Sequence, residues 1–238
     1  MADDLEYPGS AGVPDWDSLY RARGDEVVRH RPVFTGDVFE RVPVQSLGQV
    51  RTKNIIILQH PCALRSNGVE LHPRLMVAEV RQHRVIPVEE WNGHLSKMPL
   101  PDLKPTVTSG RRHQAAFFDE PYLIGPDDLD PDKRVACLSP SGVNLLLQRW
   151  VHHNSRAVVP TATYQDVSSP AYEEADLVEE WVEERLEAGL DIREAGVEAV
   201  KWLREDAGGG VTRQELLKNP QSRSIVRQQL RAALRQHR

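Results

Sequence analysis

The stretch NIIILQHPC, residues 54–62, runs from three isoleucines and a leucine into a His, a Pro and a Cys. A short apolar run rich in β-branched residues is typical of a buried β-strand. Pro61 has no backbone N–H to donate to a neighbouring strand, so the strand must end close to it. We therefore expect a buried strand that stops near His60 and a loop that begins with Pro61 and Cys62.

Further strands are predicted on both sides of this stretch. The segment VFTGDVFERVPV, residues 33–44, alternates apolar and polar residues as a half-buried strand does. The segment RLMVAEVRQHRVIPVEEW is predicted to form two strands, and QAAFFDEPYLI and RVACLS one each. Residues 92–113, rich in Pro and Gly, are predicted to form a long loop. Five or six short strands and no α-helix between residues 33 and 138 predict a small barrel or a strongly curved sheet.

Helices are predicted only after residue 138. Ser139 is a favourable N-cap, and Pro140 suits the first helical position. The apolar residues that follow share one helical face, namely Val143, Leu146, Leu147, Trp150 and Val151. Two acidic amphipathic helices are predicted within residues 167–206, and a basic helix over about residues 221–237.

Four short segments follow one another in a recognisable order. They are Gly36-Asp37-Val38-Phe39, the basic segment GQVRTKN expected in a loop, the apolar IIILQHPC, and DDLDPDKRVACLSPSGVNLLLQRW at residues 127–150. This order resembles the toxins of the PemK/MazF class over about residues 34–155, and it implies an SH3-like barrel and ribonuclease ancestry. Arg51 matches the catalytic Arg of those toxins, but no Ser or Thr stands at their second catalytic position, near residues 80–82. The strand end is also similar to uncharacterised bacterial and phage proteins in which it reads ILSQTCD.

The predicted fold class is α+β, with a small curved SH3-like β-barrel followed by an α-helical C-terminal extension. Residues 1–32 are expected to form a partly ordered N-terminal lead-in. Residues 33–157 are expected to form the PemK-like barrel with its terminal helix. Residues 158–238 are expected to form the helical extension, with acidic helices and a basic C-terminal helix.

Three cationic residues near the strand of residues 54–59 are the candidate catalytic set. Arg51 precedes the strand, and His60 and Arg65 follow it. RNA cleavage needs cations that hold the phosphate and an imidazole that acts as general acid or base. We predict that Arg51, His60 and Arg65 lie at one rim of the barrel. The alternative is that they are ordinary exposed loop residues, and enzyme activity stays open because the Ser or Thr is absent.

Cys62 supports a thiol-based alternative. On an extended chain His60 and Cys62 point to the same side, and an imidazolium lowers the pKa of a thiol. The competing interpretation is a buried thiol at a strand end beside an exposed His. Cys137 lies far along the sequence and no CxxC pair occurs, so both cysteines are expected to be reduced thiols.

Two helical faces are candidate nucleic-acid contacts. The first carries cationic residues on successive turns of the helix after residue 139, namely Arg149, His153 and Arg156. The second is a row of arginines four residues apart in the last predicted helix, namely Arg223, Arg227, Arg231 and Arg235. Cations in such rows bind the phosphate backbone without reading the base sequence. The alternative for the first face is an ordinary solvated helix surface.

Charge asymmetry offers another role for the last helix. The chain of 238 residues has a net charge of −5, but the charges are unevenly distributed. Residues 173–206 contain thirteen acidic and four basic residues, whereas residues 207–238 contain one acidic and seven basic residues. The basic helix therefore either binds a partner or docks on the acidic helices of its own chain.

Several classes of protein are disfavoured. No apolar run approaches the length of a membrane helix, and the acidic N-terminus lacks the features of a signal peptide, so a cytoplasmic protein is expected. No phosphate-binding loop, HExxH, GxSxG or dinucleotide motif occurs. The acidic residues 127–132 lack the Gly and Glu of a calcium loop. No metal and no cofactor is therefore expected.

Two functions stay open. The first is a nucleic-acid-binding or RNA-cleaving protein of a toxin–antitoxin or phage-defence system, with RNA, DNA, an antitoxin or another protein as partner and no membrane. The second is a non-catalytic adaptor or scaffold that assembles with partner subunits through its charged helices. The sequence leaves the oligomeric state undetermined.

Overall fold

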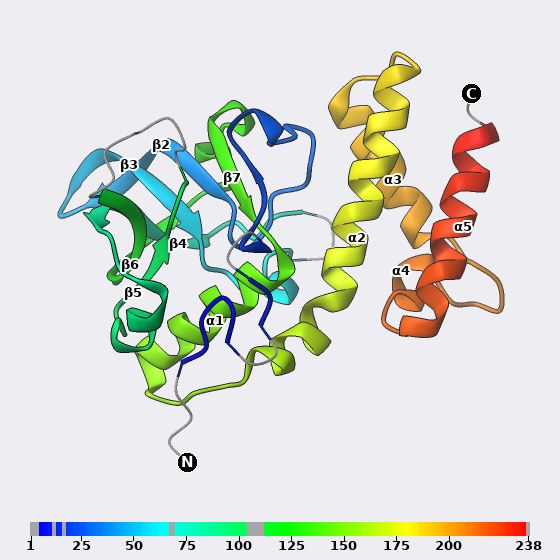
Figure 1. Cartoon of the computed structure of the whole chain (residues 1–238). Coiled ribbons are helices and arrows are strands. Elements are labelled where there is room, and N and C mark those ends of the chain that lie inside the picture. Colours follow the sequence, from blue (N-terminus) through cyan, green and yellow to red (C-terminus); the bar gives the residue numbers. More distant parts are fainter. Residues whose placement is uncertain (1–4, 11–12, 16–17, 67–69, 104–111, 237–238) are drawn as a thin grey trace. The chain divides into compact units, whose positions relative to one another are not determined.

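The computed structural model describes residues 5–10, 13–15, 18–66, 70–103 and 112–236. Their architecture is α+β, as predicted, and Figure 1 shows the course of the chain. The strands are β1 (Tyr20–Arg23), β2 (Val38–Ser46), β3 (Gln49–Ile57), β4 (Leu75–Arg84), β5 (Lys97–Leu100), β6 (Arg112–Ile124) and β7 (Arg134–Leu138). The helices are α1 (Pro140–Ser155), α2 (Thr161–Glu187), α3 (Ile192–Arg204), α4 (Arg213–Leu216) and α5 (Pro220–Gln236).

The seven strands form one antiparallel sheet in the order β1-β7-β2-β3-β4-β6-β5. Six of them lie between residues 33 and 138, where the described residues contain no α-helix, so this part of the strand prediction is confirmed. Three details were wrong. The basic segment GQVRTKN, predicted as a loop, forms the first part of β3, since only its Gly48 lies outside the strand. After β4 the chain forms the 3-10 helix Val88–Gly93 instead of another strand, and the predicted loop of residues 92–113 contains β5. Residues 104–111 of that loop lie outside the described residues.

The sheet is curved but is not closed into a barrel. Its edges are β1 and β5, and no ladder joins them within the described residues. Side chains connect the two edges instead: the Tyr20 hydroxyl donates to the Pro101 carbonyl at 2.9 Å, and Arg23 donates to the Asp102 carbonyl at 3.1 Å. Pro99 and Pro101, in and after the four-residue β5, lack the N–H groups that a closing ladder needs. An SH3-like arrangement stays a prediction.

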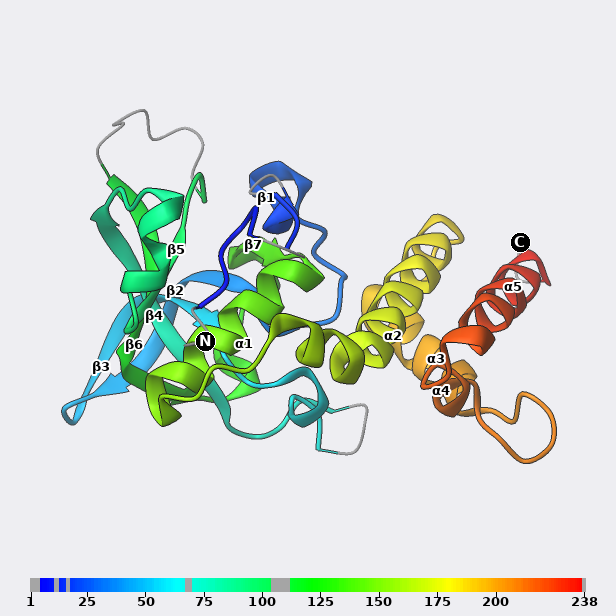
Figure 2. The ribbon, with the colours of Figure 1, turned by 60° about the horizontal axis from the view of Figure 1, so that its bottom comes forward.

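Strands β3 and β4 are paired over only part of their length. The β2–β3 hairpin is hydrogen-bonded from its tip at Gln49 to Ile56, whereas β3 pairs with β4 only through residues 55–57. Beyond Glu79, β4 pairs with β6 alone. The hairpin and the β4–β6 pair therefore diverge, as Figure 2 shows.

The chain divides into two compact units, each described here by itself. The sheet unit comprises residues 1–29 and 34–166, and the helical unit comprises residues 30–33 and 167–238. In the sheet unit, α1 buries its apolar side, and Phe118 of β6 meets Trp150 of α1 edge-on with 5.6 Å between ring centroids. As predicted, the Ser139 side chain caps α1 by accepting from the Gly142 N–H at 3.1 Å.

Large apolar residues from all the helices of the helical unit form its core. Trp181 of α2 and Trp202 of α3 lie 5.4 Å apart between ring centroids. The cluster also contains leucines and a valine of α2, of the position directly after α4, and of α5, namely Leu177, Leu217, Val226, Leu230 and Leu234. No helix within the described ranges is long and apolar enough to cross a membrane.

Candidate functional site

The residues predicted to form a catalytic set do not come together. Arg51 is exposed and pairs with Val44 near the tip of the β2–β3 hairpin, whereas His60 follows the other end of β3. Six residues of extended strand separate Arg51 from Ile57, and at about 3.3 Å per residue this is roughly 20 Å. Arg65 lies farther along the chain, bridged to Leu71. One rim carrying all three residues is therefore not found.

His60 and Cys62 organise a turn rather than an activated thiol. The backbone N–H of Cys62 donates to His60 Nδ1 at 3.2 Å and so caps the short 3-10 helix Pro61–Ala63. Burial raises the pKa of the Cys62 thiol and lowers the pKa of His60, so both groups favour their neutral forms. The exposures are also the reverse of the predicted ones, since Cys62 is exposed and His60 half-buried, and Cys137 is buried.

Arg149 was predicted on an exposed phosphate-binding face, and this prediction is wrong. The side chain is fully buried, and its guanidinium donates to the carbonyls of Trp91 at 2.8 Å, His94 at 3.5 Å and Glu6 at 3.0 Å. Burial lowers the pKa of Arg149 to about 10, so the group is still charged at neutral pH. Arg149 holds the backbone around residues 88–94 and cannot reach a phosphate in solution.

The other two residues of that predicted face, His153 and Arg156, differ in exposure and in surroundings. His153 is half-buried and stacks on Trp150, with 6.2 Å between ring centroids and 19° between ring planes. Arg156 is exposed in the left-handed conformation that ends α1. The three residues therefore form no common cationic surface.

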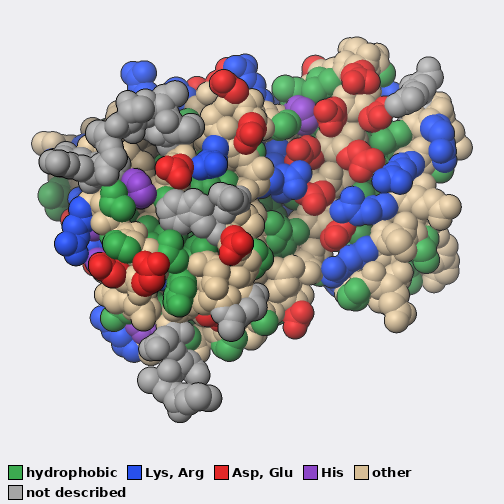
Figure 3. Space-filling view, viewed as in Figure 1, with side chains coloured by type: hydrophobic (Ala, Val, Ile, Leu, Met, Phe, Trp, Pro, Cys, Tyr) green, Lys and Arg blue, Asp and Glu red, His purple; other side chains and the backbone are tan. Residues whose placement is uncertain are grey.

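The arginine row of α5 faces acidic residues of α2 within the helical unit. Arg227 donates to Glu173 at 2.6 and 3.0 Å, and Arg231 lies 3.9 Å from Glu180. Arg223 donates to the Leu217 carbonyl at 2.9 Å, and Arg235 is exposed. In Figure 3 a row of blue side chains on α5 lies against red side chains of α2. The geometry agrees with the alternative prediction that the basic helix docks on the chain's own acidic helices.

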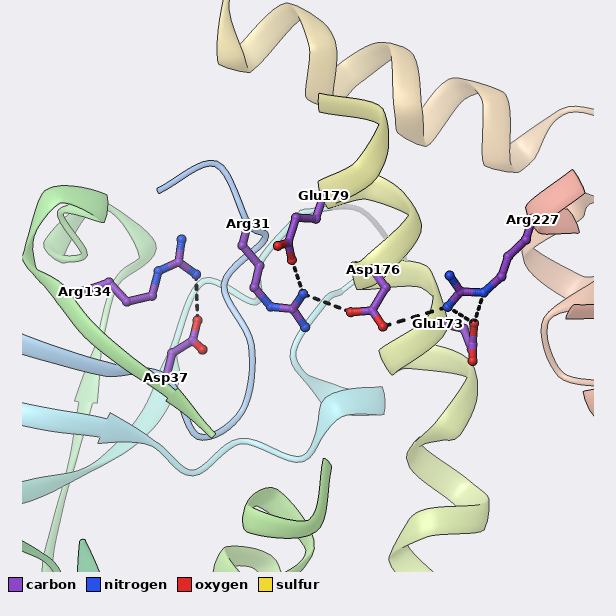
Figure 4. A network of polar contacts seen from close by, with 7 residues as sticks. All are labelled: Arg31, Asp37, Arg134, Glu173, Asp176, Glu179 and Arg227. Atoms are coloured by element: carbon purple, nitrogen blue, oxygen red, sulfur yellow. Dashed lines mark hydrogen bonds and ion pairs between the residues drawn. The ribbon is translucent and has the colours of Figure 1, made fainter. Parts of the chain in front are cut away.

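Figure 4 shows two further ion-pair groups, one in each unit. In the helical unit, the nearly buried Arg31 donates to Asp176 at 3.0 Å and to Glu179. In the sheet unit, Arg134 and Asp37 form a pair buried to 1% exposure of each side chain, with 2.9 Å between donor and acceptor. The Gly-Asp segment that carried the toxin resemblance thus has a structural role here.

A cationic cluster absent from the sequence-based predictions lies on one face of β4, β6 and β5. Arg81 and His83 are two residues apart on β4 and so point to the same face. The register places Arg81 opposite Ala115 and His83 opposite His113 of β6, and it places Lys97 of β5 opposite Phe117. We call this surface, with the adjacent His94, the cationic face.

Phe117 is the centre of the cationic face. The guanidinium carbon of Arg81 lies 3.9 Å from the ring centroid, and Lys97 Nζ lies 5.1 Å from it. Both contacts are cation–π interactions, in which the face of the ring attracts a positive charge. The half-exposed Arg81 and the partly exposed Lys97 cover the ring, which is only 8% exposed. One aromatic ring is therefore in contact with two cations, and Glu79 lies opposite it on β4.

Two imidazoles adjoin these cations. His83 Nδ1 lies 2.8 Å from the Arg84 carbonyl, so in the neutral ring this nitrogen carries the proton and Nε2 is the acceptor. Lys97 Nζ lies 3.5 Å from that Nε2, and the His94 ring is 6.2 Å from the His83 ring. Burial, followed by the nearby Lys97, His83 and Arg84, lowers the pKa of His94, while Glu90 opposes the shift.

Positive charge exceeds negative charge around this cluster. Glu79, on the same face, pairs with Lys53 at 2.8 Å and lies 3.8 Å from Arg81, and Glu90 is close enough to His94 to oppose the lowering of its pKa. Blue and purple side chains lie beside one another along the left border of Figure 3, near β5 and β6. Arg81, His83, His94 and Lys97 thus make a site suited to a polyanion.

Part of this site was within reach of sequence reasoning. Arg81 and His83 alternate in a segment predicted as strand, and that spacing alone places them on one face. Lys97 and His94 were predicted to lie in a loop. Their position beside β4 could not be predicted without the pairing of β5 with β6.

Comparisons with protein-family models, with curated proteins and with solved structures gave no match to this chain. The described residues contain no group of three or more His, Cys, Asp or Glu side chains arranged to hold a metal ion. The site must therefore be interpreted from its own chemistry, and the PemK/MazF resemblance stays a prediction.

Proposed function

We propose that the sheet unit binds nucleic acid through the cationic face. The observation that carries the proposal is that Arg81 and Lys97 both contact the Phe117 ring, with His83, His94 and His113 close by. Cations that are positioned before binding lose little conformational freedom when they contact phosphates. The Phe117 ring is covered and unavailable for base stacking, so the binding should depend on the phosphate backbone rather than on base sequence.

Binding is tested by fluorescence anisotropy with a labelled single-stranded RNA and a DNA of the same sequence. The double variant Arg81→Ala, Lys97→Ala should bind about tenfold more weakly, and its log–log salt dependence should be less steep because fewer counterions are released. Arg74→Ala is the matched control, since Arg74 is an exposed arginine just before the opposite end of β4. Equal affinity of the double variant and the control would remove the proposal.

RNA cleavage is a second candidate function, favoured by the distance of 6.2 Å between the His83 and His94 rings with Lys97 beside them. One imidazole can remove the proton from a 2′-hydroxyl, the other can protonate the leaving 5′-oxygen, and an ammonium can stabilise the charged phosphorane. The products would be a 2′,3′-cyclic phosphate and a 5′-hydroxyl. His94→Gln should abolish cleavage and leave binding within about twofold. An RNA that stays intact with the unmodified protein excludes this activity and leaves the binding proposal standing.

A role in a toxin–antitoxin or phage-defence system stays a prediction. The adaptor function predicted from the charged helices has less support, because Arg227 and Arg231 of α5 face carboxylates of their own chain.

A further inference from the structure

Strand β3 has an unpaired edge near the hairpin tip. It pairs with β2 from Gln49 onward, but its ladder with β4 begins only at Ile55. The opposite edge of residues 49–54 therefore meets no strand among the described residues. Unpaired N–H and C=O groups along an extended strand are a template for one more strand.

The register shows which backbone groups point outward. Ser46 and Gln49 flank the two-residue turn Leu47-Gly48, in which both residues have positive φ, so they form a hydrogen-bonded pair. Hydrogen-bonded and non-hydrogen-bonded pairs alternate along an antiparallel ladder. The backbone groups of Val50 and Thr52 therefore point away from β2, toward the open edge. The position of Pro43 opposite Thr52 is consistent, because a proline fits only where no N–H is donated across the pair.

The outer edge of β2 is different. Pro43 removes one of its outward N–H groups, and the irregular pairing between Phe39 and Val42 distorts the strand at Arg41, where φ is +57°. Proline and bulges are devices that block the addition of a strand. The edge of β3 contains neither device between residues 49 and 54, so it is the edge available for pairing.

Side chains along this edge select the kind of partner. Arg51 and Lys53 lie on one face of β3, and Val50, 65% exposed, lies on the other. Lys53 pairs with Glu79, so the exposed cation on this edge is Arg51. An added strand with acidic residues on the side of Arg51 and apolar residues beside Val50 would match both faces. A second copy of β3 is disfavoured because residues 41–53 contain basic but no acidic residues, which would place like charges across the new ladder.

We propose that the open edge of β3 binds an extended segment of a partner protein, with acidic residues at alternate positions and apolar residues between them. Backbone hydrogen bonds to Val50 and Thr52 supply the pairing. The exposed Arg51 sets the preference for an acidic residue, since Lys53 already pairs with Glu79. The nucleic-acid proposal depends on other residues, Arg81 and Lys97, although Glu79 contacts both Lys53 and Arg81.

Amide hydrogen exchange of the full chain tests the site directly. The probe is a blocked heptapeptide of alternating Asp and Val, and the control peptide has Lys in place of Asp. In the free protein we expect fast exchange at Val50 and Thr52 and slow exchange at Arg51, whose N–H points toward β2. The Asp peptide should slow exchange at Val50 and Thr52 at least tenfold, and the Lys peptide should not. Exchange at these two amides that is unchanged by the Asp peptide would overturn the proposal.

Two variants sharpen the test. Thr52→Pro removes an outward N–H that β2 does not use, and it should abolish peptide binding, while Thr52→Val should preserve it. If Thr52→Pro fails to fold, Arg51→Glu replaces it and should weaken binding of the Asp peptide about tenfold, with Arg74→Glu as control. The Arg81→Ala, Lys97→Ala variant should keep the exchange protection, which distinguishes this site from the cationic face. A dimer that pairs through β3 in sedimentation analysis, and that Thr52→Pro dissociates, would overturn the assigned occupant.

Discussion

Several arginines have different surroundings in the two units, although Arg134 of the sheet unit also forms a buried pair with Asp37. In the helical unit, Arg31, Arg185 and Arg227 each lie within 3.0 Å of a carboxylate. In the sheet unit, Arg81 stacks on Phe117 and lies 3.8 Å from its nearest recorded carboxylate, and Arg149 donates to carbonyl groups. A cation that is paired with a nearby carboxylate produces only a weak electrostatic field at a distance. A cation held by an aromatic ring keeps its net charge and can still attract an anion. The sheet unit is therefore the better place to look for a polyanion site.

Among the variants that test this comparison, the largest loss of stability is expected from substitution of Arg149. Arg149→Leu would leave the buried carbonyls of Trp91 and Glu6 without their guanidinium donors, at a cost of about 2–4 kcal/mol in the free energy of unfolding. Arg156→Leu, at the exposed end of α1, is the control and should change stability by less than about 0.5 kcal/mol. Urea unfolding of both variants measures the difference. Similar midpoints for the two would show that burial of Arg149 contributes no stability.

Substitution of Arg31 should cause a smaller loss of stability, and it tests how much the ion pairs of the helical unit contribute. Arg31→Met keeps the apolar part of the side chain but leaves Asp176 and Glu179 without this cation, and we expect about 2 kcal/mol of destabilisation. Arg29→Met is the control, since the Arg29 side chain forms an exposed ion pair with Asp132. Thermal unfolding of the two variants gives the comparison, and an unchanged transition for Arg31→Met would contradict it.

The ion pair between α5 and α2 should contribute less. About a third of the Arg227 side chain and a quarter of the Glu173 side chain are exposed, so solvent screens the pair. A double-mutant cycle with Arg227→Ala and Glu173→Ala should give a coupling of about 0.5–1 kcal/mol. Arg235→Ala, on the same helix and exposed, should be neutral. A coupling near zero would mean that docking of α5 depends only on its apolar residues.

The smallest predicted effect is a pH dependence of nucleic-acid binding. Burial and the cations Lys97, His83 and Arg84 lower the pKa of His94, with Glu90 opposing them, so His94 is neutral at pH 8. Phosphates beside it favour the protonated form, so binding takes up a proton and the affinity should rise about two- to threefold as the pH falls toward 6. His94→Gln should remove most of that rise. An affinity independent of pH would place the phosphates away from His94.

Protonation of His94 acts oppositely on the free protein. In the folded protein the pKa of His94 lies below 6.5, the value in the unfolded chain. Above pH 6.5 the neutral imidazole therefore contributes its full stability to the folded state. This contribution is lost as the pH falls from 6.5 through the folded pKa, because the unfolded chain binds the proton more readily. Unfolding measured with and without RNA over the same pH range should therefore show opposite slopes for this contribution.

Much of the fold followed from local patterns. The alternation in residues 33–44 and the apolar run in residues 54–59 predicted β2 and β3, and Ser139 with Pro140 predicted the start of α1. These predictions succeeded because the periodicity of apolar residues in a strand or helix can be recognised from residues close together in the sequence. Strand β5 was missed because its four residues contain a proline and lie in a segment rich in Pro and Gly.

The candidate site depended much less on local pattern. Arg149 occupies a helical position that looked exposed, yet a large apolar residue far earlier in the chain, Trp91, covers it. Lys97 joins Arg81 only because β5 and β4 both pair with β6. Contacts of this kind depend on the register between strands, and the sequence of a single segment does not determine that register.

The sequence by itself determined the succession of short strands and later helices, the opposite charges of residues 173–206 and 207–238, and the N-cap of α1. Each of these is a property of residues close together in the chain. Only the tertiary structure decided which cations are neutralised, which are buried, and which meet on the cationic face. The physical reason is that a charge takes its energy from groups within a few ångströms, and folding brings those groups from distant parts of the chain.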